Sequence, residues 1–257
     1  MPSALIAGIS GQDGYYLSEM LVSKGYSVFG LIHDTDPERE KKMKAEVPGL
    51  ELIHGDLTDT ASLFRALDVS TPTEVYNLGA KSHVAFSLEQ AQQTAQVTAI
   101  GVLNLLEAIR ISFPDSPNRP RFYQASSSEM FGKAQETPQR ETTLLWPRSP
   151  YGVAKVFGHH MTINYRESYG FHASSGILFN HESPRRGPEF VTRKVSQAVA
   201  RIVTGKQDKL VMGNLDAQRD WGFAGDYVKA MWLMLQQDMA DDYVIATGKV
   251  HSVRDLV

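Results

Sequence analysis

Tyr151 and Lys155 stand four residues apart in a stretch of helical pattern, which places both side chains on one face of a helix. A phenol with a pKa near about 10 is a poor base at neutral pH, but a neighbouring ammonium group favours its ionised form. The spacing therefore predicts a tyrosine that exchanges a proton with a substrate hydroxyl. An amphipathic helix with an exposed lysine would have the same spacing by chance.

A second reactive group, Ser126, Ser127, Ser128 and Glu129, follows an apolar run of strand length. Ligands of parallel α/β sheets bind at the carboxyl ends of the strands. A serine hydroxyl there can hydrogen-bond a substrate oxygen, and a carboxylate can move a proton. Turn chemistry, with Glu129 as a surface acid, is the alternative interpretation.

Gly8, Gly11 and Gly14 lie between the first expected strand and the first expected helix, with the spacing GxxGxxG. Glycines at such a turn let the backbone approach a pyrophosphate, which then lies against the N–H groups at the positive end of the helix. The order of strand, turn and helix favours a dinucleotide site over a plain glycine turn. An oxidised nicotinamide ring would also favour the ionised form of Tyr151, and Lys155 would hold the nicotinamide ribose.

The residues after the second expected strand bear on the choice between NAD and NADP. An acid there contacts the ribose 2′-hydroxyl of NAD, whereas an arginine holds the 2′-phosphate of NADP. Asp34 and Asp36 follow this strand and no arginine precedes Arg39, so the acids indicate either an NAD site or an ordinary loop. Asp56, after the third strand, is placed to meet the adenine. The charged run 34–44 is interpreted as a solvated loop and helix face.

Apolar runs of strand length alternate with helical patterns through most of the chain. Continuous apolarity suits strands covered on both faces, so we predict an α/β fold with a Rossmann-like doubly wound parallel sheet. The expected strands are 4–9, 28–32, 50–53, 75–78, 122–126, 173–179, 209–212 and 243–246. The expected helices are 15–23, 61–67, 97–111, 151–169, 190–203 and 227–237.

Two regions are expected: a dinucleotide-binding Rossmann domain over 1–178, and a smaller substrate-binding cap over 179–257 that is interleaved with the first. Ser252, three residues before Asp255, predicts a helix N-cap. The helix that it opens is cut short at Val257, so we expect the cap to be truncated.

The composition excludes several classes of protein. The 257 residues are 42% hydrophobic and 21% charged, which is ordinary for a globular protein, and the formal charge of −3 is a poor footprint for broad nucleic-acid binding. With no cysteine, disulfides, thiolate metal sites and cysteine nucleophiles are ruled out, and we expect no metal. The N-terminus lacks signal-peptide features and no apolar run is expected to reach membrane-spanning length, so we expect a cytoplasmic protein.

Taken together, the motifs resemble the extended short-chain dehydrogenase/reductases, and nearly end to end the GDP-mannose 4,6-dehydratase family among them. The stretches that carry the resemblance are 8–14, 75–80, 122–126, 147–155, 176–184, 190–194 and 219–222. Of these, 179–184 (FNHESP) and 219–222 (RDWG) are more specific than either short motif.

The resemblance implies a hydro-lyase that converts GDP-D-mannose to GDP-4-keto-6-deoxy-D-mannose by internal hydride transfer and loss of water, with NADP, or alternatively NAD. Tyr151 would take the O4 proton, Ser127 would hydrogen-bond the C4 oxygen, and Glu129 would remove the C5 proton and help water to leave C6. An acid beside the serine is required for elimination and not for epimerisation. A related nucleotide-sugar epimerase or reductase, and a noncatalytic nucleotide-binding subunit, are the alternatives. A homodimer or homotetramer is expected.

The resemblance also implies three sets of site residues. The catalytic set is Ser127, Glu129, Tyr151 and Lys155. The cofactor set is Gly8, Ile9, Ser10, Gly11, Gln12, Asp13, Gly14, Asp56, Leu57, Leu78, Gly79, Ala80, Lys81, Ser82, Tyr151, Lys155, His181 and Arg186. The substrate set is Ser82, Asn180, Lys194 and Arg219. Arg186 would reach the 2′-phosphate of NADP, from this subunit or a neighbouring one. Loop capping by Asn180 and His181, and pairing of Arg219 with Asp220, are the alternatives.

Three departures from the family pattern stand out. Ser127 replaces a usual threonine and keeps the hydroxyl. His33 and Asp34 replace a usual basic pair. Family members continue well past the position of Val257.

Overall fold

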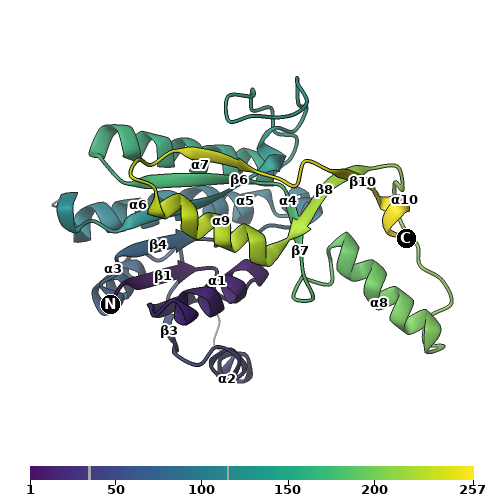
Figure 1. Ribbon diagram of the computed structural model, residues 1–257, viewed down its shortest axis with the longest axis horizontal. Helices are drawn as coiled ribbons and strands as arrows, with labels where there is room; N and C mark the ends of the chain where they lie inside the picture. Colours follow the sequence, from purple (N-terminus) through teal and green to yellow (C-terminus); the bar gives the residue numbers. More distant parts are fainter. Residues whose placement is uncertain (34–35, 115) are drawn as a thin grey trace.

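A parallel seven-stranded sheet forms the centre of the computed structural model, which describes residues 1–33, 36–114 and 116–257 (Figure 1). In spatial order its strands are β3 (Leu50–His54), β2 (Ser27–Ile32), β1 (Ser3–Ala7), β4 (Glu74–Asn77), β5 (Arg121–Ser127), β6 (Ala173–Leu178) and β9 (Asp242–Ile245). All five residues of β1 are buried, because helices cover both faces of the sheet. The strand order changes direction between β1 and β4, where sheets of this type bind ligands.

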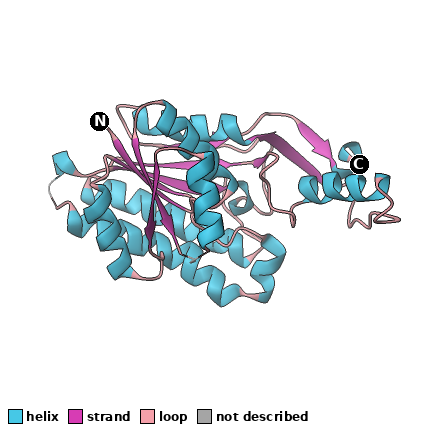
Figure 2. Ribbon diagram, turned by 90° about the horizontal axis from the view of Figure 1, so that it is seen from below, coloured by secondary structure: helices cyan, strands magenta, loops and turns pink. Residues whose placement is uncertain are grey.

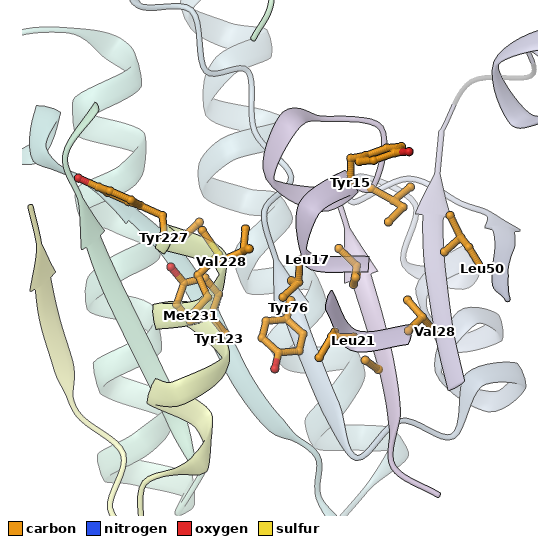
Figure 3. Close-up of a cluster of buried hydrophobic side chains, with 14 of the residues drawn as sticks. Tyr15, Leu17, Leu21, Val28, Leu50, Tyr76, Tyr123, Tyr227, Val228 and Met231 are labelled. Carbon is orange, nitrogen blue, oxygen red and sulfur yellow. The ribbon is translucent and has the colours of Figure 1, made fainter. Parts of the chain in front are cut away.

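Helices pack on both faces, and consecutive residues of β1 face opposite sides. Ala4 and Ile6 belong to one buried cluster, together with α1 (Gln12–Ser23) and α9 (Ala224–Gln236) (Figure 3). Leu5 and Ala7 belong to the other cluster, with α3 (Thr60–Ser70), α6 (Gly101–Ser112) and α7 (Pro150–Tyr169). The remaining helices are α2 (Pro37–Glu46), α4 (Val84–Glu89), α5 (Ala91–Thr94), the π-helix η1 (Ala95–Ile100), α8 (Val191–Val203), α10 (Val253–Leu256) and the 3₁₀ turns η2 (Ser116–Asn118) and η3 (Ser128–Met130). The predicted α/β class with a doubly wound parallel sheet is therefore confirmed.

A second, three-stranded sheet was not predicted. It consists of β10 (Val250–Ser252), β8 (Gln218–Phe223) and β7 (Asn180–Glu182), in that order. These strands are short and mostly polar, so the sequence carries no apolar run that would mark them. The strand expected at 209–212 is wrong: these residues form a loop in which Val211 is 68% exposed, because they have no neighbouring strand in the described part of the chain.

The segment after β6 contributes to both sheets. β9 completes the large sheet and α9 packs against α1, whereas α8 and α10 lie beside the small sheet, away from the main layers (Figures 1 and 2). The N-cap predicted at Ser252 is confirmed, because its Oγ accepts from the Asp255 N–H at 3.1 Å and Asp255 accepts from the Ser252 N–H at 2.8 Å.

One helical stretch, 91–112, is long and apolar enough to cross a membrane by length and composition, contrary to the expectation that no run reaches that length. Half of this stretch is buried within the protein. Val102, Leu105, Leu106 and Ile109 are fully buried against α3 and the sheet. Its apolar residues are thus those of a helix that packs in a core.

Candidate active site

The glycine-rich turn between β1 and α1 packs closely against the residues that follow β4. Gly8 has a φ of +83°, and a Cβ there would lie 2.7 Å from the backbone nitrogen of Gly79. A Cβ on Gly14 would lie 2.6 Å from the Gly8 carbonyl oxygen. Gly11 caps α1 without any side-chain hydrogen bond. Within the described part of the chain, no side chain covers the N–H groups of the first turn of α1, as phosphate binding requires.

This turn borders a cavity of about 680 Å³ at the carboxyl ends of the large sheet's strands. The cavity extends from the ends of β2 and β3, past the glycine-rich turn, to the end of β5 and the start of α7. Every predicted site residue lines it except Ile9 and Lys194. Ile9 is 1% exposed and packs in the core, so the prediction that it binds cofactor is not matched by its placement. Lys194 instead donates to the Val211 carbonyl at 3.2 Å and ties α8 to the following loop.

Asp56 lies at the end of the cavity nearest β2 and β3. Its Oδ1 accepts from the backbone N–H and the hydroxyl of Thr58, both at 2.7 Å. Burial would raise the pKa of Asp56, but these hydrogen bonds and the nearby His33 and Lys81 hold it below its usual value. His33 and Lys81 line the same part of the cavity.

The two acids considered after β2 are Asp34 and Asp36. Asp36 caps α2, because its Oδ1 accepts from the N–H groups of Glu38 and Arg39 at 3.2 Å. Its role is thus that of an ordinary capping acid, and it does not line the cavity. Asp34 lies outside the described residues.

Ser127, Glu129, Tyr151 and Lys155 meet at the opposite end of the cavity. β5 ends at Ser127, whose Oγ accepts from the Glu129 N–H at 3.2 Å and so orients the next turn. Ser149 caps α7 by accepting from the Gly152 N–H at 3.0 Å, which puts Tyr151 in the first turn of the helix. Two elements far apart in sequence thereby bring a carboxylate and a phenol to one wall.

Lys155 lies beneath Tyr151, as their spacing predicts. Its Nζ lies 5.6 Å from the centroid of the tyrosine ring and donates to the Ala125 carbonyl at 2.6 Å. Burial lowers the pKa of Lys155 to about 8 and raises the pKa of Tyr151 to about 12, although a hydrogen bond with Ser127 opposes the latter shift. The pKa of Tyr151 is thus set mainly by burial, and the lowering of this pKa expected from the neighbouring ammonium group does not dominate.

A hydrogen-bonded cluster joins the glycine-rich turn to β7. His181 Nε2 lies 2.8 Å from Asp13 Oδ2, and the Gln12 side chain donates to the His181 carbonyl at 3.1 Å. Ser183 Oγ donates to Gln12 Oε1 at 2.7 Å. Asn180 and His181 lie within β7 and pair with β8, so they do not cap a loop.

Two arginines line the cavity near its outer edge. Arg186 pairs with Glu182 at 3.1 Å and its guanidinium lies 3.6 Å from the Phe190 ring centroid. Arg219 is exposed and donates to the Gln218 carbonyl. The alternative pairing with Asp220 is not formed, because the Asp220 carboxylate accepts instead from Thr247 and the Gly248 N–H.

Sequence reasoning missed several residues that line the cavity: His83, Gln93, Val97, Glu189 and Phe190. Gln93 and Val97 come from α5 and the π-helix η1, which the sequence showed only as part of a longer helical pattern. A π-helix often marks a functional site, but it leaves no simple spacing to read. Among the described residues, no group of three or more His, Asp or Glu is arranged to hold a metal ion.

Solved structures with this fold place the chain among the short-chain dehydrogenase/reductases. A UDP-glucose 4-epimerase from Thermus thermophilus, in complex with NAD, superposes with a TM-score of 0.83 and 27% identity over 98% of this chain and 80% of that chain. A dTDP-glucose 4,6-dehydratase from Streptomyces venezuelae shares the fold with a TM-score of 0.83 at 22% identity, over 98% of this chain and 78% of that chain.

Sequence comparison narrows this class to one family. The family model described as GDP-mannose 4,6 dehydratase matches residues 5–257. A GDP-mannose 4,6-dehydratase of Yersinia enterocolitica is 53% identical over 100% of this chain and 70% of its own length, and the human one is 51% identical over 99% and 70%. The chain belongs to the GDP-mannose 4,6-dehydratase family.

Proposed function

We propose that this protein is a hydro-lyase that converts GDP-D-mannose to GDP-4-keto-6-deoxy-D-mannose. The observation that carries the proposal is the placement of Glu129 beside Ser127 and Tyr151 in one cavity wall, opposite a glycine-rich turn. An epimerase needs only to remove and return hydrogen at C4, whereas loss of water from C5 and C6 requires a further acid–base group. Glu129 is that group.

The residues present fit a nicotinamide dinucleotide. The close backbone approaches at Gly8 and Gly14 suit the pyrophosphate, as does the first turn of α1, which no described side chain caps. Asp56 and Leu57 suit the adenosine. Lys155, beneath Tyr151, suits the nicotinamide ribose. When bound, the nicotinamide would supply the redox chemistry, because its oxidised form can accept a hydride from C4 and its reduced form can return a hydride to C6. The positive charge of the oxidised form favours the ionised form of Tyr151.

The protein's own residues then handle the protons. Tyr151 Oη takes the proton of the sugar O4 while Ser127 Oγ donates a hydrogen bond to that oxygen. Glu129 removes the C5 proton, which the C4 ketone has made acidic, and delivers it to the C6 hydroxyl so that the C6–O bond breaks and water leaves. The O4 proton held by Tyr151 is delivered to C5 when C6 is reduced, which returns both side chains to their starting protonation states, so no external base is needed.

Cationic and amide side chains at the outer edge would hold the nucleotide sugar. Arg219 supplies a guanidinium group suited to a diphosphate, and Asn180 and Ser82 supply hydrogen-bonding groups along the cavity wall. Lys194, turned toward Val211, would need to rotate to contribute.

The finer assignments belong to the same proposal. NADP is the proposed cofactor and NAD the alternative; the ammonium group of Lys81, which lines the cavity near Asp56, supports NADP. Arg186 lies near Tyr151 rather than near Asp56, so its contact with a 2′-phosphate would be made across a homodimer or homotetramer. Residues 1–178 would bind the dinucleotide and 179–257 the sugar nucleotide, in the cytoplasm.

A product assay tests the proposal. The protein is incubated with GDP-mannose and catalytic NADP, with no added reductant, and the product is identified by mass spectrometry. The proposal predicts accumulation of a product lighter by one water, with a 4-keto group. A product of unchanged mass would indicate an epimerase, and the absence of any product, with cofactor binding retained, would indicate a noncatalytic nucleotide-binding protein.

A further inference from the structure

His181 has both ring nitrogens engaged by the protein itself. Nδ1 lies 2.8 Å from the Phe179 carbonyl oxygen and Nε2 lies 2.8 Å from the Asp13 carboxylate. Both partners are acceptors only, so the ring must donate from both nitrogens, which only the imidazolium form does. The ring also stacks on Tyr227 of α9, with centroids 4.4 Å apart and an interplanar angle of 19°. His181 is thus a cation with no free N–H to offer a ligand.

Asp13, its partner, lies in the first turn of α1 and lines the cavity. The positive end of a helix attracts a pyrophosphate, but an unpaired carboxylate in the same turn would repel it. Gln12 fixes the pair, because its Nε2 donates to Asp13 Oδ1 and to the His181 carbonyl, both at 3.1 Å. The Asp13 and His181 side chains are 22% and 11% exposed, so solvent screens their charges only weakly.

We propose that His181 is a positioning residue whose charge cancels that of Asp13, and that this cancellation allows the glycine-rich turn to hold the pyrophosphate of a dinucleotide. The inference rests on the proposed nicotinamide-dependent function of the same cavity. In this role the ring nitrogens of His181 do not contact the cofactor. His181 acts on the cofactor electrostatically, by neutralising the Asp13 carboxylate in the first turn of α1.

Other charged and titratable groups surround the pair: Arg186, Lys155, Tyr123, Tyr151 and Tyr227. The two cations have acceptors of their own, since Arg186 pairs with Glu182 and Lys155 donates to the Ala125 carbonyl. Burial alone would lower the pKa of His181, but the Asp13 carboxylate raises it above its usual value. His181 is therefore the cation in direct contact with Asp13.

Charge substitutions separate this role from a structural one. His181→Gln keeps a donor toward Asp13 without the charge, and we expect it to raise the Kd for NADP and for NAD by about 10- to 100-fold. Asp13→Asn removes the opposing charge, so the double variant D13N/H181Q recovers to within about 3-fold of wild type. Tyr227→Phe is the matched control: it keeps the stacked ring and removes a hydroxyl that has no hydrogen-bond partner among the described residues, so its Kd stays unchanged.

A pH series gives an independent measurement that does not need the H181Q variant to fold. The wild-type Kd rises as the pH is raised through the elevated pKa of His181, because Asp13 then loses its counter-charge. The D13N variant lacks this rise while keeping Lys155 and Arg186, so the difference between the two curves isolates the pair.

The outcomes distinguish this inference from the proposed function. A wild-type protein that binds neither NAD nor NADP would contradict the proposed function. Wild-type binding with an H181Q Kd within 2-fold of wild type, a loss that D13N does not rescue, or parallel pH curves for wild type and D13N would each overturn the inference alone.

Discussion

The buried environment of Lys155 disfavours the charged form of its side chain. Its side chain is 3% exposed, its Nζ donates to the Ala125 carbonyl, and burial lowers its pKa to about 8. Holding a proton there at neutral pH costs folding free energy. A residue kept at such a cost is explained by chemistry at Tyr151 better than by stability.

Replacing Lys155 by methionine tests this cost. The pKa of Lys155 is about 8 in the folded protein and 10.5 for an unperturbed lysine, so the unfolded chain binds more protons between these values and wild-type stability rises with pH across that window. This difference between the folded and unfolded pKa values corresponds to a change in the free energy of unfolding on the order of 3 kcal/mol. Urea denaturation of wild type and K155M from pH 7.5 to 10.5 should show the wild type gaining roughly 2–3 kcal/mol relative to the variant, and two parallel curves would refute the explanation.

The two proton-transfer residues give a second prediction at this scale. Glu129→Gln and Tyr151→Phe keep side-chain shape and remove the proton-transfer group, so each should lower kcat about 10²- to 10⁴-fold and leave the dinucleotide Kd within about 2-fold. Steady-state kinetics and binding titrations measure both. Glu89→Gln, an exposed glutamate at the end of α4, is the control and should retain full activity. Near-normal turnover in either site variant would remove it from the mechanism.

Local spacing predicted some of these residues and not others. Tyr151 and Lys155 share a helix, so four-residue spacing was enough to place them together. The raised pKa of Tyr151 depends on how deeply α7 is covered, which spacing does not contain. Asp13 and His181 are 168 residues apart, and only the folded chain brings them into contact.

Among the elements, those with clear end signals were predicted best. α7 begins at Pro150 after the Ser149 cap and ends at Tyr169, where Gly170, with a φ of +65°, forms the C-cap. All three signals are local. β7 and β8 were missed because they are short and polar, and they form only by pairing with each other and with β10. Strands of this kind depend on partners that the sequence does not name.

The turn between β1 and α1 gives the prediction at this scale. Gly8→Ala puts a Cβ 2.7 Å from the backbone of Gly79 in addition to straining a φ of +83°, so it should lose dinucleotide binding and destabilise the protein by more than about 2 kcal/mol. Gly25→Ala has nearly the same φ, +82°, but no described residue outside its own chain neighbours lies within 4 Å of the added Cβ. It should cost about 1 kcal/mol and leave binding unchanged. Equal effects in the two variants would mean that the close approach at Gly8 is unimportant.

For the molecule as a whole, the sequence predicted only in part that the C-terminal segment adds a strand to the large sheet. The apolar pattern at 243–246 marked a strand, now β9, but not its place beside β6, more than 60 residues earlier. α9 packs on α1 and brings Tyr227 to His181, so the C-terminal segment supports the glycine-rich turn from behind. Such long-range pairing is set by the whole core and not by any one stretch.

Dinucleotide binding should therefore stabilise the entire fold. At about 100 times Kd, a ligand that binds only the native state adds about 2.7 kcal/mol, which corresponds to a rise in Tm on the order of 5–10 °C for a chain of this size. Thermal unfolding with equal concentrations of NADP and NAD would show the larger rise for the preferred cofactor. No rise with millimolar concentrations of either would contradict the proposed cofactor site.

The central claim is that Tyr151 and Glu129 act on one sugar in an internal redox dehydration. The most direct measurement uses GDP-mannose labelled with deuterium at C4, with catalytic NADP and no reductant, and locates the label in the product by NMR. The account predicts a 4-keto-6-deoxy product with the deuterium at C6 of the same molecule. Deuterium retained at C4 of an epimerised sugar, or lost to solvent, would contradict it.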